Sequence, residues 1–290
     1  MEKLNLIDSL YDSWKRSPYP SVKLTSYFPA YAQIFGHLVN KECTFIETGV
    51  LGGGSLFMWR NWLGPKARII GVELNPDAKK WEKEGFEIYI GDQGDPEFWA
   101  DTFSKVGDFD GFLDDGGHQS FQQIVTATQA IKHARNNCVI AIEDTATSFM
   151  NDFRSHGRKS FLNYSKDATD ILIGRSFDLY EKRFPNIKNN EILKEYQNVY
   201  NIQFFNGIVS FHVSKEFSEK PQIVRNMEQG PIIDYRYSGK NYALINWPDL
   251  FKNKLTKVNG GEILRYKVRN MIAKILPIRI KKLISKFISS

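Results

Sequence analysis

Between residues 44 and 143 the chain alternates short apolar runs with longer segments in which apolar residues recur at helical spacing. Runs of this kind are typical of strands buried on both faces. Strands that alternate with helices of about 10–15 residues indicate βαβ units and a parallel sheet. The pattern predicts strands over residues 44–49, 67–74, 86–91, 109–114 and 137–143. It predicts helices near residues 54–63, 77–84, 95–105 and 119–135.

Two further segments follow the fifth predicted strand. Residues 152–200 are polar and rich in helical pattern, and we expect an insert here that covers the crevice at the sheet edge. Residues 201–213 carry Asn206-Gly207 between alternating apolar runs, the strongest short signal for a β-hairpin. The sequence therefore predicts an α/β, Rossmann-like, mostly parallel sheet of seven strands that ends in a hairpin.

The sequence also predicts the organisation of the segments outside the sheet. Residues 1–40 are expected to be helical, with a loop around Ser17–Pro20, and residues 41–215 to form the main domain around the insert. Residues 216–261 show no clear pattern and are expected to be an irregular extension. Residues 262–290 are predicted to form basic amphipathic helices.

The net charge of +6 comes from the end of the chain. Residues 262–290 hold eight Lys and Arg residues against one acid, Glu262, which leaves a net charge of −1 on residues 1–261. This distribution does not support a nucleic-acid partner. Basic residues interleaved with apolar ones suit an anionic membrane surface. The alternatives for this tail are docking on the protein's own core and a contact in a homo-oligomer.

Two cysteines, Cys43 and Cys138, lie in apolar runs and are read as buried thiols, which indicates a reducing compartment. Neither a secretory signal nor a run of about 18 apolar residues is visible. We therefore expect a cytoplasmic protein, held by its tail at the inner face of the membrane if the membrane interpretation is right.

Acidic residues follow two predicted strands that should be neighbours. Asp114 and Asp115 end the fourth strand, and Glu143 and Asp144 end the fifth. The carboxyl ends of parallel strands face the crevice where α/β sheets bind ligands. Asp115, Glu143 and Asp144 would supply oxygen ligands for Mg²⁺ or another divalent cation.

His118 follows at a turn and is the candidate general base. Asp114 could replace Asp115 as a ligand or could only orient the turn beside Gly116-Gly117. The structural alternative makes Asp114 and Asp115 turn residues, and Glu143 and Asp144 caps of the next segment.

A glycine-rich turn, Gly49 to Gly54, follows the first predicted strand and precedes a helix that begins near Ser55. Leu51 stands where the dinucleotide fingerprint G-x-G-x-x-G requires glycine. Glu47 would repel a pyrophosphate but suits the positively charged methionine part of S-adenosylmethionine. The alternative to a cofactor site is an ordinary glycine-rich turn between a strand and a helix, with surface acids beyond it.

Acids at the next two strand ends strengthen the nucleotide interpretation. Glu73 can hold ribose hydroxyls, and Asp92-Gln93 can reach the adenine. Asp114 is counted with this group as a cofactor neighbour. The predicted S-adenosylmethionine site is Glu47, Gly49, Gly53, Ser55, Glu73, Asp92, Gln93 and Asp114.

The stretch 44–144 resembles the metal-dependent sugar O-methyltransferases of macrolide biosynthesis and their cephalosporin hydroxylase-like relatives. The family's Asp-x-x-His motif falls on Asp115 and His118, and its Glu-Asp pair falls on Glu143 and Asp144. The resemblance implies a class I methyltransferase fold, S-adenosylmethionine and Mg²⁺ as cofactors, and a sugar hydroxyl as acceptor. Lys23 and Tyr27, outside the resemblance, are guessed to border the active site.

The predicted activity is methyl transfer from S-adenosylmethionine to a sugar hydroxyl, on a cell-surface glycan or a glycosylated natural product. Two other functions compete with it. One is an NAD-dependent nucleotide-sugar oxidoreductase, which Leu51 and Glu47 oppose. The other is a non-catalytic, membrane-associated scaffold that keeps a nucleotide-binding fold.

Overall fold

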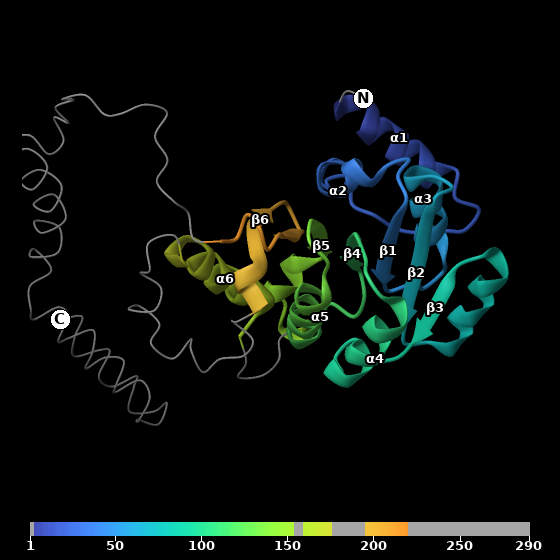
Figure 1. Cartoon of the computed structure of the whole chain (residues 1–290). Coiled ribbons are helices and arrows are strands. Elements are labelled where there is room, and N and C mark those ends of the chain that lie inside the picture. Colours follow the sequence, from blue (N-terminus) through green and yellow to red (C-terminus); the bar gives the residue numbers. More distant parts are fainter. Residues whose placement is uncertain (1–2, 154–158, 176–194, 220–290) are drawn as a thin grey trace, which may run out of the picture. The chain divides into compact units, whose positions relative to one another are not determined.

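The structure is a computed structural model of the 290-residue chain, and it describes residues 3–153, 159–175 and 195–219 (Figure 1). The chain divides into two compact units, residues 1–222 and 223–290, and the described residues all belong to the first. The predictions for the basic helices at 262–290, and for residues 220–261 of the extension, lie outside the described residues.

The described part of the chain forms one sheet in the order β3-β2-β1-β4-β5-β7-β6. The first five strands along the chain run parallel, and β7 is antiparallel to both β5 and β6. Each predicted parallel strand is confirmed, with ends within two residues. The strands are β1 Cys43–Thr48, β2 Ala67–Glu73, β3 Glu87–Ile90, β4 Gly111–Asp114, β5 Cys138–Ile142, β6 Val199–Phe204 and β7 Val209–Val213.

The hairpin between β6 and β7 turns at Asn206-Gly207, as predicted, with the Phe205 N–H donating to the Ile208 carbonyl. Of the two turn residues, Gly207 adopts the left-handed region, with φ 87°.

The predicted helices are present as well, with one difference in type. Residues Pro76–Glu84 form a 3₁₀ helix, η2, rather than an α-helix. The α-helices are α1 Lys3–Lys15, α2 Tyr27–Phe35, α3 Gly54–Leu63, α4 Pro96–Val106, α5 Ser120–His133 and α6 Phe161–Arg175. The other 3₁₀ turns described are η1 Gly36–Leu38, η3 Thr145–Phe149, η4 Asn151–Phe153 and η6 Glu195–Asn198. Among the described residues, no helix is both long and apolar enough to cross a membrane.

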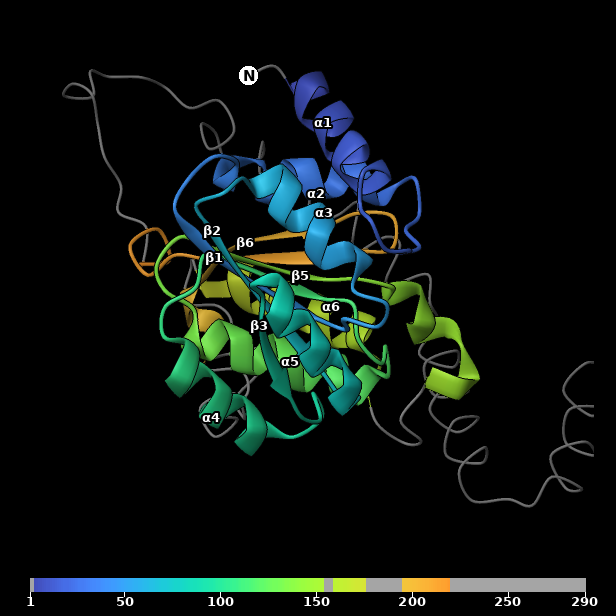
Figure 2. The same ribbon diagram turned by 90° about the vertical axis from the view of Figure 1, so that its right-hand side faces the viewer.

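Helices cover both faces of the sheet (Figure 2). α1, α2, α3 and η2 pack on one face, where Phe35, Phe45 and Trp59 stack edge to face or tilted. α4, α5 and α6 pack on the other face, around Trp99 and Phe112. Cys43 belongs to the first core and Cys138 to the second, and both are free buried thiols as expected.

The insert after β5 does not cover the crevice in its described part. Phe161, Ala168 and Ile171 of α6 are buried in the same core as α5, because they form an apolar stripe at helical spacing. Residues 154–158 and 176–194 of the insert lie outside the described residues. α6 therefore extends the helical layer on one face of the sheet.

Gly49, directly after β1, is where two strand-end loops meet. It has φ +89°, and a side-chain Cβ there would lie 1.9 Å from the backbone oxygen of Asp115. The Asp115 N–H in turn donates to the Thr48 carbonyl at 2.9 Å. Only glycine lets the loop after β1 approach the loop after β4 this closely.

Gly49→Ala should therefore lower the free energy of unfolding by about 3 kcal/mol or more, because left-handed strain and a backbone clash add together. The matched control is Gly85→Ala. Gly85 has φ +85°, but the nearest atom to its added Cβ is the Arg60 guanidinium at 4.0 Å. The control should cost about 1 kcal/mol, as expected for left-handed strain alone. Denaturant unfolding of both variants is the measurement, and equal losses would contradict the close approach.

Candidate active site

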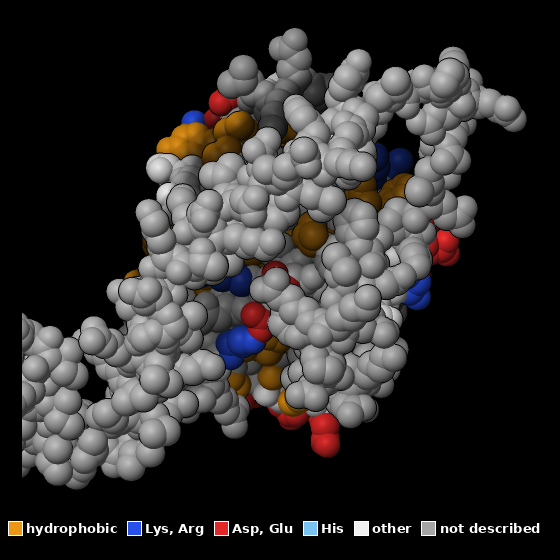
Figure 3. All heavy atoms as spheres, turned by 90° about the vertical axis from the view of Figure 1, so that its left-hand side faces the viewer, with side chains coloured by type: hydrophobic (Ala, Val, Ile, Leu, Met, Phe, Trp, Pro, Cys, Tyr) orange, Lys and Arg blue, Asp and Glu red, His pale blue; other side chains and the backbone are white. Residues whose placement is uncertain are grey.

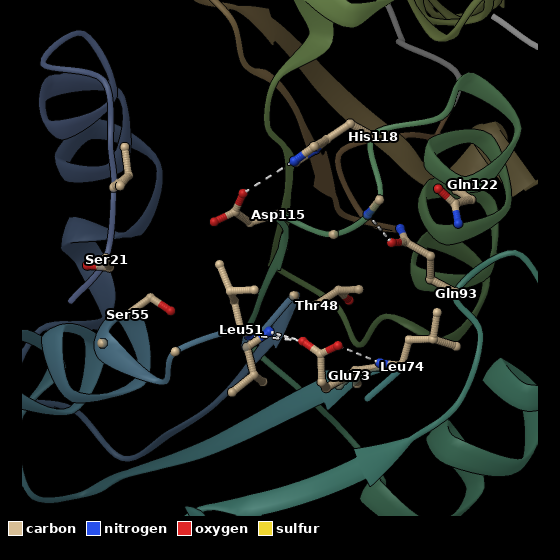
Figure 4. Close-up of a pocket in the computed structure, with 18 of the residues that line it drawn as sticks. Ser21, Thr48, Leu51, Ser55, Glu73, Leu74, Gln93, Asp115, His118 and Gln122 are labelled. Carbon is tan, nitrogen blue, oxygen red and sulfur yellow. Dashed lines mark hydrogen bonds and ion pairs between the residues drawn. The ribbon is translucent and has the colours of Figure 1, made fainter. Parts of the chain in front are cut away.

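A cavity of about 530 Å³ opens at the carboxyl ends of β1 to β4 (Figure 4). The loops after these strands form most of its wall, and Pro20–Lys23 of the loop between α1 and α2 complete it. Its volume falls within the range of roughly 300–1,000 Å³ typical of small-molecule sites. Of the predicted site residues, seven line it, namely Gly49, Ser55, Glu73, Asp92, Gln93, Asp115 and His118. Glu47, Gly53, Asp114, Glu143 and Asp144 are not in its wall.

Glu73 joins two of the loops in the cavity wall. One carboxylate oxygen accepts from the Val50 and Leu51 N–H groups, each at 2.9 Å. The other accepts from Leu74 and Asn75. A carboxylate offers about four acceptor positions. The predicted ribose contact of Glu73 therefore requires a hydroxyl to replace one of these backbone donors.

Gln93 and Asp114 build the turn that carries Asp115. The Gln93 amide donates to both Asp114 carboxylate oxygens, at 2.9 and 3.1 Å, and its carbonyl oxygen accepts from the Gly117 N–H. Asp114 also accepts from the Gly116 N–H at 3.1 Å and is 1% exposed. Of the roles left open for Asp114, the geometry favours that of orienting the turn.

Asp115, His118 and Asp144 come together as a candidate metal site. One carboxylate oxygen from each aspartate and the His118 Nε2 lie within 4.8 Å of one another. His118 Nε2 is 3.5 Å from Asp144 Oδ2 and 3.9 Å from Asp115 Oδ1. Two carboxylates and an imidazole are a donor set that divalent cations accept.

The backbone at this cluster is strained. His118 has φ 56° and Asp144 has φ 54°, both in the left-handed region that disfavours side chains. The Thr147 hydroxyl lies within hydrogen-bonding distance of both of their carbonyl oxygens, at 3.0 and 2.8 Å. Strain of this kind gathers at functional sites, where the surrounding structure holds it in place.

Glu143 is paired with a lysine and does not belong to the cluster of Asp115, His118 and Asp144. The Lys23 ammonium donates to both Glu143 oxygens, at 3.1 and 3.2 Å, and also to Asp115 Oδ2. The Tyr31 hydroxyl donates to Glu143 Oε2. Burial alone would lower the pKa of Lys23, but the charges of Glu143 and Asp115 raise it, so Lys23 is a cation.

Asp144 has a phenol as its partner. The Tyr27 hydroxyl donates to Asp144 Oδ1, which leaves Oδ2 facing His118. The hairpin turn packs closely against Tyr27. A Cβ added at Gly207 would lie only 2.7 Å from the Tyr27 hydroxyl oxygen. The Gly207 carbonyl also accepts from the Thr145 N–H.

Burial raises the pKa of two buried carboxyl groups here, those of Glu143 and Asp114. Burial raises the pKa of Glu143 to about 8, against the opposing charge of Lys23. Burial likewise raises the pKa of Asp114 to about 6, although its bonds from Gln93 and Gly116 lower it. Neither residue is in the cavity wall, but Asp114 directly precedes Asp115 of the wall and Glu143 shares Lys23 with it, and perturbed acids beside a cavity are typical of active sites.

Glu47 points into the core on the α3 face. It is fully buried, and its carboxylate accepts from the Ser55 hydroxyl at 2.7 Å and the Trp59 indole N–H at 3.0 Å. Burial raises its pKa to about 7, although the charge of Lys23 lowers it. Its predicted contact with a cofactor stays a prediction, because Glu47 is not in the cavity wall, although its partner Ser55 is.

The glycine turn is packed by the protein itself. A Cβ at Gly53 would lie 2.4 Å from the Trp81 ring, and one at Gly54 would lie 2.4 Å from the Tyr19 carbonyl oxygen. These glycines therefore serve close packing of the N-terminal loop and η2. Two polar atoms near the cavity, Thr48 Oγ1 and His118 Nδ1, are buried without a hydrogen-bond partner among the described residues.

The sequence missed Tyr31 and only guessed Lys23 and Tyr27. Tyr27 and Tyr31 are one helical turn apart in α2, a spacing that puts both on one face. That signal was present, but the strand end that the face would meet depends on how α2 docks. Lys23 lies in a loop without periodicity, so no local pattern marks it.

The strand order defines the fold of the protein. The strand order, with five parallel strands and a reversed β7, is that of class I methyltransferases, so the predicted fold is confirmed. The MycE methyltransferase of the mycinamycin biosynthetic pathway, in complex with Mg and SAH, matches with a TM-score of 0.62 at 21% identity. The match covers 76% of this chain and 58% of that one. A complex of the same enzyme with mycinamycin VI matches with a TM-score of 0.61.

Curated relatives of the chain are O-methyltransferases by name. Demethylmacrocin O-methyltransferase of Streptomyces fradiae is 29% identical over 133 residues, which are 43% of this chain and 33% of that protein. Mycinamicin VI 2''-O-methyltransferase of Micromonospora griseorubida is 29% identical over 132 residues, with the same shares. The chain thus spans about a third of the length of these relatives. No protein-family model matches the sequence.

Glu47→Gln should change how stability depends on pH. The folded-state pKa of Glu47, about 7, is above its ordinary 4.5, so the folded protein holds this proton more tightly. The free energy of unfolding therefore falls as pH rises from about 4.5 to about 7. The glutamine variant should lack this fall and be more stable at pH 8, by up to about 3 kcal/mol.

The measurement is urea unfolding from pH 4.5 to 8, with exposed Glu42→Gln as the control. A Glu47→Gln variant that is destabilised equally at every pH would show that folding does not raise the pKa of Glu47. Titration with S-adenosylhomocysteine then decides the cofactor prediction. A tenfold loss of affinity would indicate direct contact, and unchanged affinity a role inside the core.

Proposed function

We propose that this protein transfers the methyl group of S-adenosylmethionine to a sugar hydroxyl, with the help of a divalent cation. The observation that carries the proposal is that Asp115 belongs to two sites at once. It lines the cavity beyond the glycine turn, and it is a member of the Asp115–His118–Asp144 cluster. A donor in the cavity and an acceptor at the cluster would therefore meet at this residue.

The donor site would use the cavity residues. The wall combines Thr48, Gly49 and Ser55 at the end of β1 and the start of α3, Glu73 and Leu74 at the end of β2, and Asp92 and Gln93 after β3. The exposed apolar side chains of Leu51 and Leu74 suit a flat base, and Asp92 is exposed beside them. The methionine part would lie near the cluster, with Gly53 and Glu47 supporting the turn from behind.

The acceptor site would use Asp115 and Asp144 to hold the cation, with Glu143 as the third predicted ligand. A bound Mg²⁺ would orient two neighbouring sugar oxygens and lower the pKa of the hydroxyl to be methylated. Asp115 and Asp144 each keep one carboxylate oxygen toward His118, because Lys23 and Tyr27 occupy the other. The protein's contribution is this fixed direction of the two oxygens.

His118 is proposed as the general base. Its Nε2 would take the proton as the acceptor oxygen bonds to the methyl carbon and the carbon–sulfur bond breaks. The sulfonium charge is neutralised in the same step, with S-adenosylhomocysteine as the second product. The left-handed backbone at His118 fixes the direction of the imidazole toward the two aspartates.

The acceptor class follows from the relatives. The names of two relatives give a rhamnosyl tetracenomycin and an olivosyl oleandolide as acceptors, and both carry a sugar. A sugar on a glycosylated natural product or on a cell-surface glycan is therefore proposed, the latter only if the tail binds an anionic membrane. On the face drawn in Figure 3, acidic and basic side chains of the described residues are interspersed.

Calorimetric titration tests the donor. The full chain should bind S-adenosylmethionine with micromolar affinity and should not bind NAD, because Leu51 stands where the dinucleotide fingerprint requires glycine, and Trp81 and Tyr19 pack closely on the glycine turn. Each titration is run with and without Mg²⁺. Binding of NAD alone would replace the proposal with the oxidoreductase function, and binding of neither would favour the scaffold.

His118→Asn tests the base. Asparagine tolerates the left-handed backbone, so the turn should keep its conformation. We expect kcat for S-adenosylhomocysteine formation, with a panel of hexose and deoxyhexose glycosides, to fall about 10²- to 10⁴-fold. Affinities for S-adenosylhomocysteine and Mn²⁺ should stay within threefold.

A tenfold loss of Mn²⁺ affinity in this variant would instead make His118 a metal ligand. Full activity of the wild-type protein in excess EDTA would remove the cation from the reaction altogether.

A further inference from the structure

Lys23 is a buried charge supplied by an exposed loop. Its side chain is 1% exposed, whereas its neighbours Val22 and Leu24 are 92% and 55% exposed. Burying an ammonium group is costly unless it is fully paired. The loop between α1 and α2 thus places one cation in the acid cluster while the residues on both sides face solvent.

The ammonium lies where a metal ion would bind the predicted ligands. It contacts Asp115 Oδ2 and, at 3.1 and 3.2 Å, both oxygens of Glu143. It is also 5.8 Å from the centroid of the Tyr31 ring, which favours a cation. Asp115 is therefore shared, with one oxygen toward Lys23 and the other toward His118 and Asp144.

The net charge of the cluster can be balanced by one divalent ion. Asp115, Glu143 and Asp144 are three carboxylates, and Lys23 is the cation that contacts two of them in the described part of the chain. With all three ionised, one lysine leaves a net charge of −2. A divalent ion at Asp115 and Asp144 would neutralise it, but the like charge of Lys23 opposes that ion's approach.

We propose that Lys23 is a resident cation of the metal site, which competes with the divalent ion for Asp115 and Glu143 and so limits the affinity for it. This rests on the proposed function only in that the site binds a divalent ion. Lys23 acts as a positioning residue, since it directs the free oxygen of Asp115 toward His118. It also stays bonded to Glu143, so the divalent ion is bound weakly and exchanges readily with ions in solution.

Mn²⁺ titration followed by electron paramagnetic resonance tests the proposal without any turnover. Lys23→Met removes the charge at similar length, and we expect Mn²⁺ affinity to rise at least tenfold. Lys23→Arg keeps a cation and should stay within threefold of wild type. Lys66→Met is the matched control, because Lys66 is exposed and precedes β2 at the opposite edge of the sheet. It should also stay within threefold.

Glu143→Gln in both backgrounds identifies the group for which lysine and metal compete. In the wild-type background the substitution should weaken Mn²⁺ binding by threefold or less, because Lys23 already holds Glu143. In the Lys23→Met background it should weaken binding at least tenfold. Binding by Lys23→Met with none detectable in wild type would support the proposal further.

Three results would overturn the proposal. They are unchanged or weaker Mn²⁺ binding in Lys23→Met, equal losses from Glu143→Gln in both backgrounds, and no Mn²⁺ binding by any variant. Titration of each variant with S-adenosylhomocysteine, together with thermal unfolding, shows that the fold is intact. Because that titration is independent of Mn²⁺, failure of the cofactor proposal and failure of the Lys23 proposal give different results.

Discussion

The carboxylate of Asp115 is the interaction on which the rest of the site depends. Its backbone is held against β1, through its N–H bond to Thr48 and its contact with Gly49. Its side chain faces Lys23 with one oxygen and His118 with the other. The glycine loop, the N-terminal segment and the acid cluster are thereby joined at a single residue.

Burial and backbone strain at the cluster cost free energy of folding, which the rest of the fold must offset. Glu143 is almost fully buried, and both His118 and Asp144 have left-handed backbones. Each strained residue costs of order 1–3 kcal/mol. The aromatic cores on both faces of the sheet supply the stability that holds this arrangement. A site with such costs is better explained by function than by packing.

The sheet was predictable because its signals are local. Apolar runs mark the buried strands, and the carboxyl ends of parallel strands meet at one edge whatever the loops do. Asp115 and His118 therefore came together as expected from their positions in the chain. The Asn206-Gly207 turn was also predictable, since glycine accepts the positive φ found there.

The direction of a side chain within its strand explains why some predicted site residues are not in the cavity wall. Phe45 and Glu47 are two residues apart in β1 and so share a face, and Phe45 belongs to the core under α2 and α3. Glu47 therefore points at Ser55 and Trp59 of α3 instead of the crevice. Asp114, the last residue of β4, is likewise turned inward, whereas Asp115, the first residue beyond it, reaches the cavity.

The N-terminal segment is part of the candidate active site rather than an addition to it. Tyr27 and Tyr31 of α2 bind Asp144 and Glu143, and Lys23 of the preceding loop binds Asp115 and Glu143. The same loop contributes Pro20–Lys23 to the cavity wall. No strand-end rule could place these residues, because their positions follow from the docking of α2 on the α3 face through aromatic packing. The chemistry at the strand ends is thus set by the fold, whereas the charge balance around it is set by a segment whose contacts are entirely tertiary.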